Sequence, residues 1–261
     1  MILWQIARRR FGANLVRPLT NTLALTVALL APTTLVYADY EPITRGEVLD
    51  VLANTSAHER PDLRNKDFRG LDLSGVDFKG ADLFGTHMRG AAFREANFDN
   101  CNMDLTIMRG ADLEGASFRN ASLFGVVLVD ADLKGADLSG ARLIADLKRA
   151  NLEGATLTKG NFGADKTNQP MGKMRVLMEK VNLKGANLSG TNLSGCDMKF
   201  ADVSGANLTD ADLSECDLRK ATFTQANMTR AVLTKARVTG AKFDGIKGKD
   251  SIIGLDKKNF D

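Results

Sequence analysis

The chain has 261 residues, in which 35 lysines and arginines face 32 aspartates and glutamates, giving a formal net charge of +3. Four arginines and no acidic residue lie within residues 1–38, so the rest of the chain is essentially neutral and gives no support for nucleic-acid binding. With two histidines and three cysteines, the sequence offers no ligand set with metal-site spacing, and we expect neither a metal nor another cofactor.

Residues 1–38 have the pattern of a secretory signal peptide. The arginines are followed by a mildly apolar run over residues 19–30, which is too short to span a bilayer. Val36 and Ala38 supply small residues at −3 and −1, so we expect cleavage after Ala38 and a periplasmic or secreted protein that meets the membrane only during export. Arg8-Arg9-Arg10-Phe11 resembles a twin-arginine motif without the Leu-Lys that follows it. Both export routes therefore stay open, as do an uncleaved anchor and a transit peptide.

Residues 39–60 predict a linker and a short helix that covers the N-terminal end of the following domain. Thr44 and Glu47 have the spacing of a capping box, in which each side chain accepts the other residue's backbone N–H. The helix would turn an apolar face inward, made of Val48, Leu49, Val51 and Leu52.

A five-residue period dominates the rest of the chain. From Leu63 to Leu143 a Leu, Phe or Met occupies every fifth position. The residue directly before it is usually Asp or Asn, and the residue two before it is small, mostly Ala. This period fits neither a helix nor a simple strand alternation, so it predicts a stacked repeat. We expect a first block over residues 61–162, an inserted loop over 163–180, a second block over 181–244 and a C-terminal cap over 245–261. One residue is missing between Leu143 and Leu147, which predicts a bulge at one corner.

The repeated unit, seen in Ala81-Asp82-Leu83, resembles the signature of the pentapeptide-repeat family over roughly residues 61–244. The resemblance implies an all-β fold, a right-handed quadrilateral parallel β-helix of about eight to nine coils with four units per coil. The central residue and the residue two before it would point inward, and the other three outward. The resemblance also makes a homodimer through the C-terminal end an expectation.

In coils of about twenty residues, positions twenty apart stack on one face. This predicts an interior ladder of rings and an exterior column of amides, formed by Phe78, Phe98 and Phe118 and by Asn187, Asn207 and Asn227. Cys101, Cys196 and Cys216 all occupy the inward position usually held by Ala, so we expect buried free thiols. Cys196 and Cys216 are one coil apart and within disulfide range, so their oxidation stays open.

One outward surface departs from what the scaffold needs. Arginines recur one coil apart, where like charges repel, and apolar residues stand near them in place of Asp or Asn. Apolar anchors with arginine are typical of protein interfaces, although neutral drift on a tolerant surface is the alternative. The predicted partner-binding patch consists of Arg69, Arg89, Arg109, Ile107, Val127, Val129, Phe84 and Phe124.

The inserted loop is the second departure. Its first half has a loop composition, and residues 173–180 predict a helical turn. Methionines at i, i+3 and i+7 would offer adaptable contacts to a partner, or would lie against the repeat if the insertion is merely tolerated. These candidate loop contacts are Met171, Met174 and Met178.

Together these features favour an exported, non-enzymatic scaffold that binds a protein or envelope component through the arginine and apolar patch. The family resemblance offers an alternative, because some members protect DNA gyrase and resemble duplex DNA in shape and charge. Such mimicry needs an acidic surface, whereas this chain without residues 1–38 is nearly neutral. No catalytic residue is predicted, since the repeat spreads the acids and no nucleophile and base have the spacing of a known motif.

Overall fold

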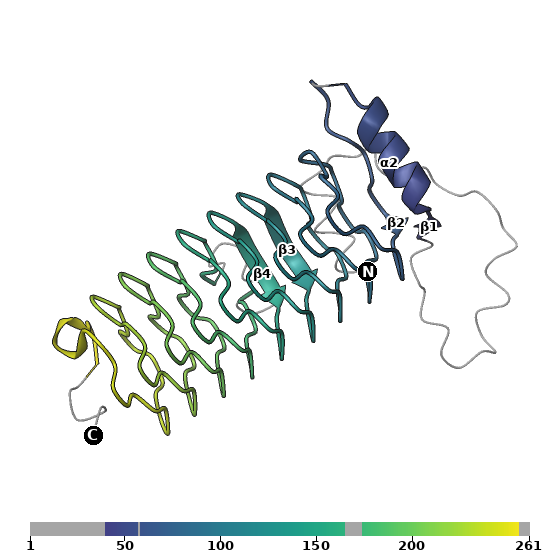
Figure 1. Ribbon diagram of the computed structural model, residues 1–261. Helices are drawn as coiled ribbons and strands as arrows, with labels where there is room; N and C mark the ends of the chain where they lie inside the picture. The colour runs from purple at the N-terminus through teal and green to yellow at the C-terminus, as the bar shows by residue number, and fades with distance from the viewer. Residues whose placement is uncertain (1–39, 57, 165–173, 256–261) are drawn as a thin grey trace, which may run out of the picture. The chain divides into compact units, whose positions relative to one another are not determined.

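The structure is a computed structural model that describes residues 40–56, 58–164 and 174–255. The predictions for residues 1–38 and for Met171 lie outside the described residues. All described residues belong to the unit that begins at Tyr40. Its coils stack one on another (Figure 1). The elements follow in the order β1 (Glu41–Pro42), α2 (Arg45–Asn54), β2 (Lys66–Asp67), β3 (Ser122–Val127), β4 (Arg142–Asp146) and η2 (Lys249–Ser251).

Each five-residue unit is one parallel bridge followed by a tight turn. In the unit 81–85, Ala81 and Leu83 are fully buried, while Asp82 bridges to the coils on either side. Asp82 Oδ1 accepts the backbone N–H of Phe84 at 3.1 Å, and Gly85 completes the turn with a φ of 68°. Because Gly and Asn tolerate positive φ and a carboxylate can hold its own turn, the corners explain both the Asp/Asn and the Gly of the repeat.

Parallel bridges join residues about one coil apart, and they fall into four columns, so the coils have four faces. We number the faces by the outward columns that begin at Asp62, Asp67, Asp72 and Asp77. The column of the second face consists of Asp67, His87, Ile107, Val127, Asp146, Leu177, Asp197, Asp217 and Arg237.

The core runs along the inside of the stack. The ring centroids of Phe78 and Phe98 are 4.5 Å apart and those of Phe98 and Phe118 are 5.1 Å apart, with the rings within 14° of parallel, which confirms the predicted ladder. All three cysteines are buried free thiols, as predicted. Burial raises the pKa of Cys101 to about 12, so this thiol stays protonated and unreactive.

The missing residue between Leu143 and Leu147 is absorbed at one corner. Strand β3 (Ser122–Val127) pairs in parallel with β4 (Arg142–Asp146). The register shifts between Phe124 and Val126, which leaves Gly125 without a counterpart in β4. The predicted bulge is confirmed, and the coils beyond it stack in register again.

The insertion ends earlier than predicted. Leu177 already bridges to Asp146 and Asp197, with Val176 and Met178 fully buried on either side of it. Residues 176–178 are therefore a regular repeat unit, and residues 174–180 contain no helical turn. This unit is hard to recognise in the sequence Val176-Leu177-Met178, because Leu occupies the position that normally carries Asp or Asn.

The N-terminal end of the stack is covered. Strand β1 (Glu41–Pro42) pairs with β2 (Lys66–Asp67), and helix α2 (Arg45–Asn54) begins at the predicted capping box. Glu47 accepts the Thr44 N–H at 2.7 Å, and Thr44 Oγ1 accepts the Glu47 N–H at 3.3 Å. The helix buries Val48 and Leu52, four residues apart, while Leu49 is 40% exposed, contrary to the predicted apolar face.

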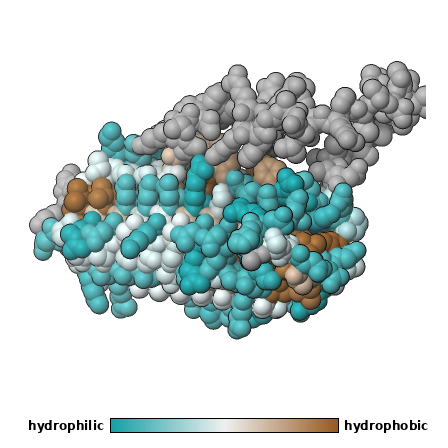
Figure 2. Space-filling model, turned by 90° about the horizontal axis from the view of Figure 1, so that it is seen from above, coloured by the Kyte–Doolittle hydropathy of each residue, from teal (hydrophilic) through white to brown (hydrophobic). Residues whose placement is uncertain are grey.

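The C-terminal end has no comparable helix among the described residues. A single turn, η2 (Lys249–Ser251), precedes the last bridge, from Val232 to Ile253. Ile253 is 53% exposed. In the view of Figure 2, hydrophobic colour gathers mainly near the two ends, and the length between them is largely hydrophilic or neutral. Dimerisation through the C-terminal end stays a prediction.

Candidate binding surface

The three predicted arginines lie where the sequence placed them. Arg69, Arg89 and Arg109 follow the second face, one coil apart, and all are exposed. Arg69 pairs with Asp67 of its own unit, with Nη2 to Oδ2 at 2.5 Å, and Arg109 lies 3.8 Å from Asp130. The three arginines of this column thus have two paired carboxylates between them.

The apolar half of the predicted patch is smaller than expected. Ile107 and Val127 are partly exposed, and so is Phe84 on the neighbouring corner. Phe124 is only 8% exposed, because its strand pairs it with Ile144 and the Arg142 guanidinium lies 5.3 Å from its ring centroid. The prediction that Phe124 is an exposed anchor is therefore wrong.

Val129 is also buried, at 3% exposed. The Val129 carbonyl accepts the N–H of Gly110, and the N–H of Asp130 donates to the Lys148 carbonyl. Val129 therefore stands between Arg109 and Lys148 in the column. Long cationic side chains cover apolar neighbours with their alkyl stems while the charge stays in water. Val129 therefore interrupts the charges of the column without offering an apolar contact to a partner.

Of the predicted loop contacts, the two described methionines do not form a loop surface. Met178 is a central core residue with no exposed area, so its prediction as a loop contact is wrong. Met174 is partly buried against the same core. Leu177, which stands between the buried Val176 and Met178, is instead the third partly exposed apolar residue of the second face.

His87 sits in the same column between Asp67 and Ile107. Its ring centroid lies 4.9 Å from that of Tyr40, and its buried Nδ1 has no hydrogen-bond partner. Burial and the nearby Arg69 lower the pKa of His87, so the imidazole is neutral at physiological pH.

An ionic cluster that was not predicted from the sequence lies farther along this face. Asp217 accepts Arg219 at 2.8 Å through both carboxylate oxygens and Arg237 at 2.7 Å. These arginines lower the pKa of Asp217, whose side chain is only 2% exposed. The spacing Asp-x-Arg, with a second arginine one coil later, is the signal that could have revealed it.

A second cluster lies one coil before the first. Asp197, stacked on Asp217, lies 3.6 Å from Arg175 and 3.3 Å from Lys199. Each of these two acids is thus shared by two cations whose side chains reach farther into solvent than the acid itself.

The arginine column is one part of a longer row, which we call the basic edge. It comprises the two positions that follow the second face in each coil, at the corner leading to the third face. Its cations are Arg69, Arg89, Arg109, Lys148, Arg149, Lys180, Lys199, Arg219 and Lys220, and its acids are Asp130 and Glu179. One corner of the stack therefore carries a large excess of positive charge.

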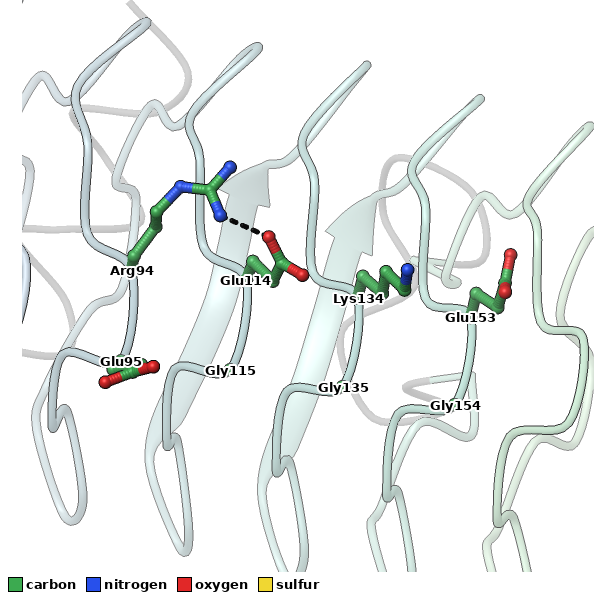
Figure 3. Close-up of a pocket in the computed structure, with 8 residues that line it drawn as sticks. All are labelled: Arg94, Glu95, Glu114, Gly115, Lys134, Gly135, Glu153 and Gly154. Carbon is green, nitrogen blue, oxygen red and sulfur yellow. Dashed lines mark hydrogen bonds and ion pairs between the residues drawn. The ribbon is translucent and has the colours of Figure 1, made fainter.

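The next corner, after the third face, shows the usual alternative. There the signs alternate from coil to coil through Arg94, Glu114, Lys134 and Glu153, and Arg94 pairs with Glu114 (Figure 3). The shallow groove beside them holds about 490 Å³ and has glycines along its floor. With Glu95, its lining has two cations and three acids, so neither sign dominates as it does on the basic edge.

The described residues bring together no group of three His, Cys, Asp or Glu side chains that could hold a metal. Nor do they include a helix of the length and apolar character that crossing a membrane requires. The features that the structure does present are a four-sided stack, three partly exposed apolar residues on the second face and a row of cations, which define a repeat scaffold with a candidate binding surface.

The chain belongs to the pentapeptide repeat family. The model of pentapeptide repeats matches with eight copies over residues 59–90, 87–123, 106–143, 175–210 and 211–247. The family fold is the right-handed quadrilateral β-helix, which confirms the predicted fold class. No match was found among curated protein sequences.

Several solved structures are similar to the chain. QnrB1, a plasmid-mediated fluoroquinolone resistance protein, is 21% identical, with 69% of this chain and 92% of that one covered and a TM-score of 0.55. HetL, involved in heterocyst differentiation regulation in the cyanobacterium Nostoc, is 26% identical over 78% and 94%, with a TM-score of 0.38. A thylakoid lumen protein of Arabidopsis thaliana is 31% identical over 58% and 71%, with a TM-score of 0.15. At these values the likeness to QnrB1 speaks for the fold alone.

Proposed function

We propose that the chain is an exported, non-enzymatic scaffold that binds a protein or another envelope component through its second face and basic edge. The observation that carries the proposal is the set of apolar residues Ile107, Val127 and Leu177 on the second face beside a row of cations; we call this set the apolar column, in which Asp146 separates Val127 from Leu177. The equivalent positions of the third face are Asp112, Asp132 and Asn182.

Asp or Asn at these outward positions holds the following turn through its side chain, although some units of other faces carry residues such as Ala92 or Thr222 there. Asp132 Oδ1 accepts the Lys134 N–H at 3.1 Å, whereas isoleucine and valine cannot supply this bond. The apolar residues of the second face therefore cost the corner a hydrogen bond and expose apolar surface. A partner that covers them would bury the exposed apolar surface and would pair with the neighbouring arginines around it, as in the centre and rim of an interface.

We propose a non-enzymatic role because the acidic side chains named next already have structural partners. Asp82 and Asp132 hold turns, and Asp130 and Asp217 pair with arginines. A catalytic carboxylate needs a free oxygen facing a substrate, in company with a second acid, a base or a metal. The carboxylates named here are committed to the scaffold.

Ile107→Asp is expected to abolish capture of the partner while the free energy of unfolding changes by less than about 0.5 kcal/mol. The new carboxylate has the position from which Asp accepts the N–H two residues later, so the corner gains its usual hydrogen bond. Immobilised wild-type and variant proteins would be exposed to an envelope extract of the source cells, and the bound components quantified by mass spectrometry.

Asn187→Asp is the matched control, because it places the same charge at the same repeat position on the fourth face. Asn187 Oδ1 already accepts the Ser189 N–H at 3.2 Å, so aspartate fits there. We expect this variant to capture the partner like the wild type. If Ile107→Asp captures the same components as the control, the second face is not the binding surface.

Protection of a topoisomerase is the second candidate function, and the fold likeness to the resistance protein QnrB1 favours it. The electrostatics of the corners speak against it. A surface that imitates DNA must present negative charge where the enzyme presents cations, but the basic edge presents nine cations and two acids.

Export separates the two candidates. We expect the native protein to begin at Asp39 and to fractionate with the periplasm or an equivalent compartment, because residues 1–38 carry the signal-peptide pattern. Cell fractionation and mass determination of the intact protein measure both properties. An intact Met1 in the cytoplasm would remove the envelope partner and restore the topoisomerase candidate.

A further inference from the structure

We propose that the basic edge binds a linear acidic polysaccharide that lies along the stack with one anionic group near each coil. The inference rests on the proposed function, since it names the chemistry of the envelope component. It uses the row of cations and does not depend on the apolar column.

The cations recur along this corner at an interval set by the fold, with a gap at Val129 and with two cations in some coils. Successive coils are one strand spacing apart, about 4.8 Å, so the side chains after the second face repeat at that interval. Sugar rings in a linear polyuronate are of similar length, and each ring carries one carboxylate. The fold therefore matches a row of charges on the protein to a row of charges on an extended polymer.

The acids near the edge cancel only part of this row: Asp67 pairs with Arg69 and Asp146 lies 3.6 Å from Lys148, but three other acids are each shared by two cations. Asp130 lies between Arg109 at 3.8 Å and Arg149 at 2.6 Å. Asp197 and Asp217 are shared in the same way by the two clusters described above. One positive charge of each group remains, and the carboxylate holds the cations in place before any ligand arrives, which reduces the ordering cost of binding.

The edge also offers an aromatic ring to a sugar. Phe200 is 45% exposed and follows Lys199 directly, and the Lys220 ammonium lies 5.3 Å from its ring centroid. A flat apolar face beside cations suits a sugar ring, whose C–H groups pack on the aromatic ring while its carboxylate meets a lysine.

Two other polyanionic surfaces fit less well. An anionic bilayer would be anchored by apolar side chains pointing from the same edge, but the large exposed hydrophobic residues in the described ranges are Leu49, Phe200 and Ile253. Of these three, only Phe200 lies on the basic edge. Single-stranded nucleic acid stacks successive bases on several aromatic rings, and the described part of the edge presents one.

The decisive variant removes three cations without leaving a carboxylate alone. In Arg109→Ala/Lys199→Ala/Arg219→Ala, the acids Asp130, Asp197 and Asp217 keep Arg149, Arg175 and Arg237. The matched control is Lys134→Ala/Lys159→Ala/Lys242→Ala, which removes the same charge from exposed positions elsewhere on the stack. Thermal unfolding of both variants checks that each is folded.

The native protein, purified from its source cells, would be titrated with fluorescent polygalacturonate. We expect saturable binding that weakens as sodium chloride is added. The affinity of the edge variant should be about tenfold or more lower, because a protein with fewer cations releases fewer counterions from the polymer when it binds. The control should bind like the wild type. Methyl-esterified polygalacturonate, which keeps the sugar chain without its charges, should not bind.

Each contrary result overturns the inference in a different way. Equal binding by the edge variant and the control would mean that overall charge attracts the polymer. Tighter binding to phosphatidylglycerol vesicles or to single-stranded oligothymidylate would assign the edge to a bilayer or to nucleic acid. If polygalacturonate does not bind but Ile107→Asp still abolishes capture, the proposed function stands and this inference fails.

Discussion

Phe98→Ala is expected to lower the free energy of unfolding by about 3–5 kcal/mol, because the removed ring leaves a cavity that the neighbouring coils cannot close. The Phe98 ring has no exposed area and is stacked between Phe78 and Phe118 at 4.5 and 5.1 Å. Phe93 adds an edge contact at 5.3 Å. In a stacked repeat each coil contacts only its neighbours, so loss of the middle ring weakens two interfaces at once.

Denaturant unfolding followed by far-ultraviolet circular dichroism measures this loss. Phe200→Ala is the control, since its ring is 45% exposed on the basic edge and its removal should change stability by no more than about 0.5 kcal/mol. Equal effects of the two substitutions would show that the assignment of inward and outward positions is wrong.

The fold was predictable because the period itself encodes the geometry. Inward Ala81 and Leu83 and the stacked Phe ladder follow from spacing alone, without knowledge of any contact. The chemistry of the corners was less accessible. The Asp/Asn of each unit has the composition of a solvated surface residue, but Asp82 Oδ1 accepts a backbone N–H, and only the turn geometry shows this.

The errors occur where the repeat changes length. Phe124 was expected outside because its position points outward in a regular unit, but the missing residue in the next coil draws β3 and β4 into an extended pair that buries it. Met178 was assigned to the insertion because Leu177 breaks the consensus before it. A period locates residues only while the count is unbroken.

The candidate surface was also predictable only where the period is unbroken. The sequence placed Arg69, Arg89 and Arg109 on one column because they share a register of twenty. The later members of the basic edge lie beyond the deletion and the insertion, so their register with the first three could be assigned only from the observed bridges, such as Asp146 with Leu177. The sharing of Asp217 by Arg219 and Arg237 depends on side-chain directions, which no spacing gives.

Asp217→Asn is expected to lower the free energy of unfolding by about 1–3 kcal/mol at neutral pH, because charge-assisted hydrogen bonds to a buried acceptor are lost. Asparagine keeps the shape of the side chain but has no charge for Arg219 and Arg237. Asp210→Asn is the control, since Asp210 is half exposed and pairs with Arg230 alone, and exposed pairs of this kind contribute little.

The pH dependence identifies the cause of the loss. Arg219 and Arg237 hold the pKa of Asp217 in the folded protein below its usual value. A carboxylate with a lowered folded pKa contributes its stability in full above the unfolded pKa of about 3.9 and loses it as the pH falls through the folded pKa. The difference in unfolding free energy between the wild type and Asp217→Asn should therefore be constant above about pH 5 and shrink in acid. A difference that persists unchanged below the folded pKa would mean that aspartate stabilises this coil by its shape and not by its charge.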